Sequence, residues 1–309
     1  MGAELPGYRL ERQIGLGAGS RIYKAVERET GKVFAIKHVV KERASDDRYF
    51  AQVENEFKVS STIDHPHLRH SYILHRVRKL LQIKELYLVM EYVDGLPLEI
   101  ARPNRMNTFF MIFRKVTFGL EAMHKAGWVH SDIKPKNVMI GRGGVVKIID
   151  FGQSCPLGQR KERVQGTPDY IAPEQVRRRA LDQRTDVFNL GATMYWTLTS
   201  QKYPTVMTAE LDPDGMNYIP VDEPVAPVEW NAKIPLPLSN LVMECCRDHP
   251  ADRPDNMEEV RNRLEAIQER WGKHREEERA RLTTKGAHDG TASSKPQKEK
   301  QRPARKSDE

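Results

Sequence analysis

Residues 129–140 have the sequence VHSDIKPKNVMI, and this stretch decides the fold that we expect. One acid, Asp132, stands two residues before Lys134 and five before Asn137, and an apolar run follows. A short apolar run bounded by polar residues is typical of a buried strand, so the three polar groups lie on a loop that enters a strand. Because functional residues concentrate on loops that a rigid scaffold positions, this loop is a candidate active site.

The bulk composition indicates a globular protein. The chain has 309 residues, of which 39% are hydrophobic, enough for one large core or two modest ones. No segment approaches about 18 consecutive apolar residues, and the N-terminus lacks the basic and apolar blocks of a secretory signal. We therefore expect no membrane span and a cytoplasmic location. Cys155, Cys245 and Cys246 are too few for a disulfide framework, so we expect reduced thiols.

The charge is unevenly distributed along the chain. The formal net charge is +7, and residues 271–309 alone hold 11 basic and 7 acidic side chains. From Thr283 onward, aliphatic and aromatic side chains are almost absent, so burial cannot offset the entropy of ordering. We predict that residues 271–309 form a disordered, basic tail that can contact acidic surfaces. No specific nucleic acid partner is predicted.

The N-terminal third has the pattern of a small sheet with one helix. Short β-branched and aromatic segments separated by glycine turns predict five strands. Phe50, Val53 and Phe57 recur at helical spacing between the third and fourth of these. The predicted elements are the strands Tyr8–Leu16, Arg21–Glu27, Val33–Val40, Tyr72–Val77 and Leu86–Tyr92, and a helix over Asp46–Thr62.

Helical periodicity dominates after Asp94-Gly95. Apolar residues at helical spacing predict helices over residues 107–126, Asp186–Ser200, Leu236–Cys246 and Met257–Gln268, with a buried strand over 145–150. The fold class expected is therefore α+β with two lobes. The N-terminal lobe covers about residues 8–91, and a mainly helical lobe covers about 94–270.

The first hairpin and the strand after it suggest a phosphate site. Gly15, Gly17 and Gly19 remove side chains from a turn between two strands, so that backbone N–H groups can approach a polyphosphate. Lys37 lies on a half-buried strand and needs an anionic partner. Glu56 and Glu54 on the following helix are the candidates, and helical geometry turns one of them roughly 200° away from the other. We favour Glu56, because Phe57 beside it anchors that helix face.

The loop at residues 129–140 has the groups for phosphoryl transfer. Asp132 can orient a hydroxyl or accept its proton, and Lys134 can neutralise a terminal phosphate. Asn137 and Asp150, which ends the segment VVKIID, supply the hard oxygen ligands that Mg²⁺ prefers.

Five motifs in unbroken order, from about Tyr8 to Arg270, together resemble the protein kinases. GLGAGSRI is similar to their phosphate loop, AIK to their strand lysine, HSDIKPKN to their catalytic loop, DFG to their metal motif and APE to their substrate-loop anchor. DIKPKN and GTPDYIAPE resemble the corresponding motifs of the serine/threonine branch. The sequence as a whole is similar to those of the bacterial eukaryotic-like kinases. The resemblance implies ATP and Mg²⁺, with Mn²⁺ as a substitute, and protein substrates phosphorylated on Ser or Thr.

The resemblance also assigns roles by position. Asp132 is the catalytic acid-base and Lys134 the γ-phosphate contact, while Asn137 and Asp150 are the metal ligands. Met90 guards a back pocket beside the adenine. The remaining nucleotide-binding residues that it implies are Ile14, Gly15, Gly17, Ile22, Ala35, Lys37, Glu56, Glu91, Val93 and Met139.

Three departures from the family pattern stand out. Ser20 replaces the third glycine of the phosphate loop, with Gly19 beside it. Ser131 replaces the arginine that precedes the catalytic acid and helps to hold a phosphorylated loop. Since Ser154 is the only hydroxyl residue between Gly152 and Gly166, we expect activity without loop phosphorylation. Third, a basic group of residues favours acidic or neutral substrates; it comprises Lys136, Arg160, Lys161, Arg163 and Arg177–Arg179.

Two other functions remain open from the residues. One is a pseudokinase that binds ATP or a partner without catalysis, which the presence of the full polar set disfavours. The other is a small-molecule kinase of the aminoglycoside type, which shares the acid-to-asparagine loop. The segment GTPDYIAPE argues against it.

Overall fold

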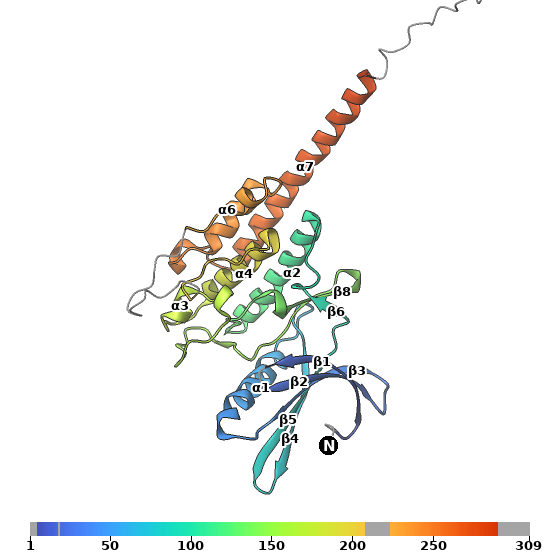
Figure 1. Cartoon of the computed structure of the whole chain (residues 1–309), viewed down its shortest axis with the longest axis vertical. Coiled ribbons are helices and arrows are strands. Elements are labelled where there is room, and N and C mark those ends of the chain that lie inside the picture. Colours follow the sequence, from blue (N-terminus) through green and yellow to red (C-terminus); the bar gives the residue numbers. More distant parts are fainter. Residues whose placement is uncertain (1–4, 18, 208–222, 290–309) are drawn as a thin grey trace, which may run out of the picture. The chain divides into compact units, whose positions relative to one another are not determined.

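The computed structural model describes residues 5–17, 19–207 and 223–289 of the chain. The chain divides into two compact units, one that ends at Ile267 and one that begins at Gln268. The first unit has a β-rich N-terminal lobe and a mainly helical C-terminal lobe (Figure 1). The predicted α+β, two-lobed fold class is confirmed.

An antiparallel sheet forms the N-terminal lobe, with five strands in the order β1-β2-β3-β5-β4. Every predicted strand and the predicted helix are present, with ends that differ by a few residues. Their bounds are β1 Tyr8–Gly17, β2 Ser20–Glu27, β3 Val33–Val40, α1 Asp47–Ser60, β4 Ser71–Lys79 and β5 Gln82–Glu91.

Strand alternation gives this sheet two apolar faces. Leu86, Leu88 and Met90 of β5 share a cluster with Val53 of α1. The intervening Tyr87 and Val89 belong to a second cluster on the opposite face, because successive side chains of a strand point to opposite sides. The helix is thereby fixed against one face of the sheet, which places its Glu56 near β3.

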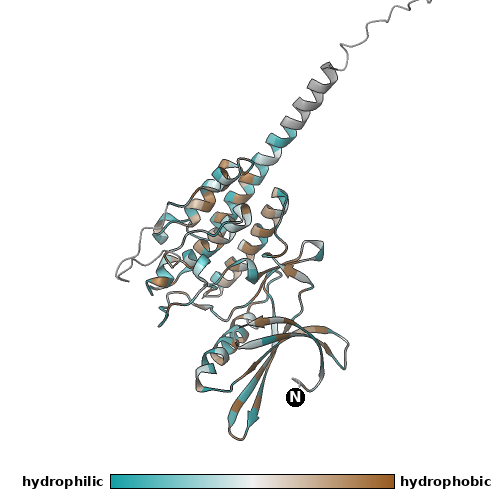
Figure 2. Cartoon of the chain, in the orientation of Figure 1, coloured by the Kyte–Doolittle hydropathy of each residue, from teal (hydrophilic) through white to brown (hydrophobic). Residues whose placement is uncertain are grey.

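The C-terminal lobe is built on α2 and α4, which carry many apolar residues (brown in Figure 2) and bury most of them. Gly191 of α4 allows α6 to approach closely, since a Cβ there would lie 2.6 Å from the Cβ of Cys245. The helices are α2 Met106–Lys125, α3 Pro173–Val176, α4 Gln183–Thr199, α5 Pro227–Trp230, α6 Leu236–Cys245 and α7 Met257–Asp289. The short strands are β6 Gly95–Pro97, β7 Trp128–Val129, β8 Val138–Gly141, β9 Val146–Ile148 and β10 Cys155–Pro156.

The last helix is longer than the sequence pattern predicted. α7 extends to Asp289, although we expected a helix that ends at Gln268 and disorder from residue 271. Residues 273–282 are mostly Lys, Arg and Glu, which are good helix formers even without an apolar face. The rest of the predicted tail, residues 290–309, lies outside the described residues. None of the helices in the described part of the chain is both long and apolar enough to cross a membrane.

A buried ion pair joins α3 to the segment that precedes α7. Arg253 donates two hydrogen bonds to the carboxylate of Glu174, at 2.8 and 2.9 Å. The Arg253 side chain has no exposed surface, and Thr185 also donates to Glu174. Removal of one partner would leave an uncompensated buried charge.

We predict that Glu174→Gln lowers the free energy of unfolding by about 3–5 kcal/mol, since the guanidinium would stay buried without its anion. Urea denaturation at 25 °C measures this. Arg177→Met is the control, because it breaks the exposed Arg177–Asp248 pair and should cost less than about 1 kcal/mol. Equal losses in the two variants would contradict the interpretation.

Candidate active site

A cleft of about 1240 Å³ is lined by residues from both lobes. It is lined by all the catalytic, metal and nucleotide-binding residues that the family resemblance implied except Glu56 and Met90, which are fully buried. Those that line it are Ile14, Gly15, Gly17, Ile22, Ala35, Lys37, Glu91, Val93, Asp132, Lys134, Asn137, Met139 and Asp150.

The glycine-rich turn joins β1 to β2, with Gly17 paired to Ser20. Gly19 has a φ of +70°, and a Cβ at this position would lie 2.5 Å from the ring of Tyr49 on α1. Glycine is therefore needed at residue 19, while the third glycine position of the family can hold Ser20.

Lys37 of β3 forms the ion pair that the sequence predicted with Glu56 of α1, at 2.6 Å. Glu54 instead pairs with Arg76 at the surface. Lys37 also lies 3.7 Å from Asp150. Burial alone would lower the pKa of Lys37, but the two carboxylates outweigh it and raise the pKa. The ammonium therefore stays charged at the centre of the cleft.

The end of β5 forms the other wall of the cleft. Met90 pairs with Ala35 of β3 and with Ser71 of β4, and its side chain is fully buried. The carboxylate of Glu91 is held by Lys147 at 2.8 Å. Val93 lies just beyond the end of the strand, where the ladder has stopped. This arrangement offers backbone groups and apolar surface to a flat ring.

Asp132 is held from two sides within the catalytic loop. Its Oδ1 accepts a hydrogen bond from the Thr167 hydroxyl at 2.8 Å, and its Oδ2 accepts one from Lys134 at 2.6 Å. Lys134 also donates to Thr167 at 2.7 Å. Asn137 donates to the backbone oxygen of Asp132 at 2.9 Å. The three side chains fix the orientation of the acid, which lines the cleft.

A second buried acid holds the backbone before Asp132. The carboxylate of Asp186 accepts hydrogen bonds from the backbone N–H groups of His130 and Ser131, at 2.8 and 2.7 Å. It is also hydrogen-bonded to the ring of His124. Burial would raise the pKa of Asp186, but these donors lower it, so the carboxylate stays ionised. Its hydrogen bonds hold Ser131 in a left-handed conformation, with φ of 59°.

Ser131 connects the catalytic loop to the segment that follows DFG. Its hydroxyl donates to the backbone oxygen of Gln153 at 2.7 Å and accepts from Lys161 at 2.6 Å. Burial lowers the pKa of Lys161, which also donates to Gln153. The side chain of Lys161 therefore turns inward, contrary to our expectation that it belongs to the basic substrate surface.

Asn137 and Asp150 fit a magnesium ion. The amide nitrogen of Asn137 is occupied by Asp132, so the amide oxygen is the atom available to a cation. The positive charge of Lys37 lowers the pKa of Asp150 to about 2, which keeps this carboxylate ionised. One amide and one carboxylate oxygen suit Mg²⁺, which usually completes its octahedron with water and substrate phosphates.

Two residues that the sequence did not single out connect α1 to this site. The side chain of Asn55 donates to the backbone oxygens of Phe151, Gly152 and Ser154, at 3.2, 3.3 and 2.8 Å. Arg69, from the segment before β4, donates to Glu56. Each contact joins residues that are well separated in the sequence, so no local pattern predicts it. The only available signal was that Asn55 is next to Glu56 and that Arg69 precedes a predicted strand.

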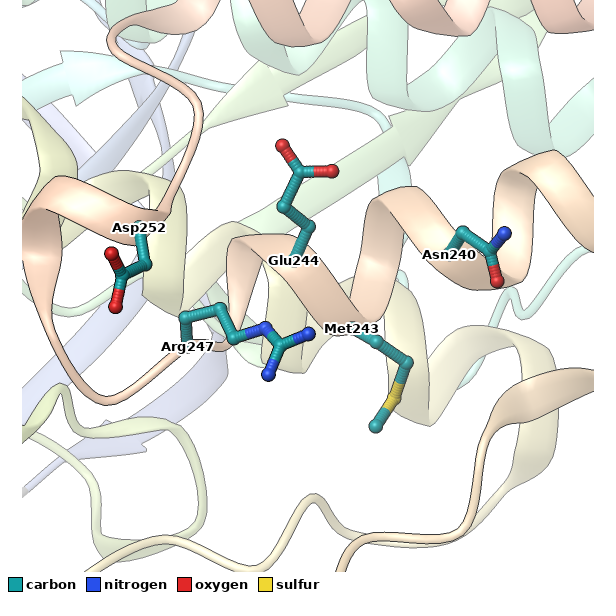
Figure 3. Close-up of a pocket in the computed structure, with 5 residues that line it drawn as sticks. All are labelled: Asn240, Met243, Glu244, Arg247 and Asp252. Carbon is teal, nitrogen blue, oxygen red and sulfur yellow. The ribbon is translucent and has the colours of Figure 1, made fainter.

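A smaller hollow of about 550 Å³ lies on the C-terminal lobe beside α6 (Figure 3). Its lining residues are Asn240, Met243, Glu244, Arg247 and Asp252. Glu244 is paired with Arg263, and none of these residues contacts the catalytic loop in the structure as described. The chemistry therefore belongs to the larger cleft.

A model of the protein kinase domain matches residues 8–264. The chain belongs to the protein kinase family. Similar proteins include a probable serine/threonine-protein kinase of Streptomyces coelicolor, 30% identical over 84% of this chain and 39% of its own length. Serine/threonine-protein kinases of Myxococcus xanthus and a Synechocystis species are each 29% identical over 84% of this chain, and over 50% and 53% of their own lengths. The chain thus spans about half, or less, of the length of these relatives.

We predict that Asn55→Ala loosens the backbone after Asp150, because three carbonyl oxygens lose their shared donor. The free energy of unfolding should fall by about 1–2 kcal/mol. Hydrogen exchange at the Ser154 amide, which is bonded to Phe151, should accelerate. Glu54→Ala on the exposed side of α1 is the control, and equal exchange in the two variants would contradict the assignment.

Proposed function

We propose that this protein kinase transfers the γ-phosphoryl group of ATP to serine or threonine hydroxyls of protein substrates. The observation that carries the proposal is that Asp132 and Lys134, which Thr167 contacts, line the same cleft as Lys37, whose ammonium is paired with the buried Glu56. One cluster can orient a hydroxyl while the other holds phosphates, which is what phosphoryl transfer requires of a protein.

Asp132 acts on the incoming hydroxyl. Its carboxylate, fixed by Thr167 and Lys134, can accept a hydrogen bond from the substrate and so direct the oxygen toward the terminal phosphorus. Because a carboxylate is a weak base, Asp132 takes the proton late, when the bond to phosphorus is already forming. The ammonium of Lys134 stabilises the charge on the transferred group.

The other residues hold the nucleotide in place. Lys37 would contact the α- and β-phosphates under the glycine-rich turn of Gly15 and Gly17, and Glu56 would orient it. The ring would lie between Ile22 and Ala35 on one side and Met139 on the other. The backbone of Glu91 and Val93 would supply hydrogen bonds to its edge, with Ile14 and Met90 completing the apolar walls.

Asn137 and Asp150 would hold Mg²⁺, or Mn²⁺ in its place. The ion, when bound, neutralises the charge of the phosphate oxygens. The protein's own contribution is to keep Asp150 ionised, through Lys37, and the Asn137 oxygen directed outward, through Asp132. We also propose a cytoplasmic location, and contact of the basic segment 271–309 with acidic surfaces.

The two alternatives are less well supported. A pseudokinase has no need of an acid oriented by two neighbours, as Asp132 is. A small-molecule kinase has no need of the segment GTPDYIAPE, yet Thr167 of this segment contacts both Asp132 and Lys134 through its hydroxyl.

Asp132→Asn should reduce phosphate transfer to generic protein substrates by roughly a hundredfold to ten-thousandfold, since the amide cannot accept the proton. Binding of MgATP should change little. Labelled ATP measures transfer and titration calorimetry measures binding. Asp255→Asn, at an exposed residue outside the cleft, is the control. Full transfer by Asp132→Asn would exclude Asp132 as the base, and no transfer by the unaltered protein would exclude the proposed function.

Activity is proposed not to require phosphorylation of the segment between Gly152 and Gly166, which we call the activation segment. The Lys161 ammonium bridges Ser131 and Gln153, and Gln175 donates to the backbone oxygens of Ser131 and Gln165 at 2.8 and 3.1 Å. These contacts fix the segment from both sides without a phosphate. The ammonium of Lys161 would repel an arginine at residue 131, which gives a physical reason for the serine at that position.

Protein that a phosphatase has treated to completion should keep its transfer rate, and so should Ser154→Ala. Lys161→Met should lose about tenfold or more, because the segment loses its tether. Glu162→Gln, at the exposed neighbouring residue, is the matched control. A near-total loss on dephosphorylation that rephosphorylation restores would contradict this proposal.

A further inference from the structure

Glu56 has two cations, one on each carboxylate oxygen. Its Oε2 accepts from Lys37 at 2.6 Å, and its Oε1 accepts from the guanidinium of Arg69. The Glu56 side chain has no exposed surface, and that of Arg69 is 7% exposed. A buried carboxylate depends strongly on such partners, because water cannot replace them.

The segment that carries Arg69 is attached to the C-terminal lobe. The backbone N–H of Arg69 donates to Ile148 of β9 at 2.9 Å, and the N–H of Ile148 donates to His67 at 2.8 Å. Ile148 is two residues before Asp150. Arg69 therefore connects α1, through Glu56, to the strand that leads into the metal-binding residue.

A second polar contact joins the same parts. The Ser60 hydroxyl, on α1, lies 2.6 Å from both the backbone oxygen of Glu56 and the hydroxyl of Ser71 on β4. Since a hydroxyl has one proton, Ser60 donates to Glu56 and accepts from Ser71. Both serines are buried. The base of α1 is thus fixed by directional hydrogen bonds.

We propose that Arg69 is a positioning residue that keeps Glu56, and with it α1, in place whether or not a nucleotide is bound. This inference rests on the proposed function. Lys37 is also attracted by Asp150, 3.7 Å away, and would be attracted by bound phosphates. If Lys37 shifts toward Asp150 or toward the phosphates, the Glu56 carboxylate is still paired with the guanidinium of Arg69. The position of α1 therefore does not depend on Lys37 alone.

Arg69→Met tests the proposal, because methionine keeps much of the volume but removes the charge. Hydrogen exchange over residues 47–60 should accelerate in the nucleotide-free variant, and kcat should fall on the order of tenfold to a hundredfold. Arg69→Lys should recover part of both. Arg76→Met is the matched control, since it removes the exposed Arg76–Glu54 pair that also joins β4 to α1. It should leave exchange and kcat unchanged.

A double-mutant cycle with Glu56→Gln shows whether Arg69 acts through Glu56. The combined Arg69→Met and Glu56→Gln variant should have the kcat of Glu56→Gln alone, within about twofold, since both changes remove the same contact. If the double variant instead loses kcat by the product of the two single-variant factors, the proposal is overturned. So would an Arg69→Met protein with a lowered Tm but wild-type exchange in α1 and wild-type kcat at 25 °C. If the unaltered protein transfers no phosphate, the proposed function fails, and exchange over residues 47–60 still decides the role of Arg69.

Discussion

The ion pair between Lys37 and Glu56 is the contact on which the rest of the site depends. It joins β3 to α1, and its carboxylate has no exposed surface. Separation of the pair would leave a buried charge, at a cost of several kcal/mol, so the position of the helix and the charge of the lysine are coupled. Arg69 adds a second cation from a segment anchored to β9, and Asn55 attaches the same helix to the backbone after Asp150.

In the C-terminal lobe, too, a buried carboxylate fixes the elements around it. Asp186 organises backbone N–H groups, and its hydrogen bonds fix the loop that presents Asp132. A contact within the chain also takes the place of one feature of the family, because Lys161 contacts Ser131 where a phosphate would contact an arginine. Two buried serines form a hydrogen bond at the C-terminal end of α1. Under the proposed function, these internal contacts make a site that is assembled before any signal reaches it.

Local patterns in the sequence predicted much of this arrangement. The strands, α1 and α2 follow from periodicity, and helical geometry was enough to prefer Glu56 to Glu54 as the partner of Lys37. Ser131 was recognisable as a departure, but its partner Lys161, 30 residues later, was not. A contact between distant side chains depends on the folded path of both segments, which no local pattern encodes. The predicted end of the last helix, at Gln268, was wrong, because the helix propensity of residues without an apolar face was given too little weight.

The most direct test of the account is a crystal structure of the protein without nucleotide and without phosphate on the activation segment. The account predicts Lys37 Nζ within about 3 Å of Glu56, with Arg69 on the other carboxylate oxygen and Lys161 on Ser131. A structure in which α1 has rotated outward, with Glu56 in solvent and Lys161 away from Ser131, would contradict it.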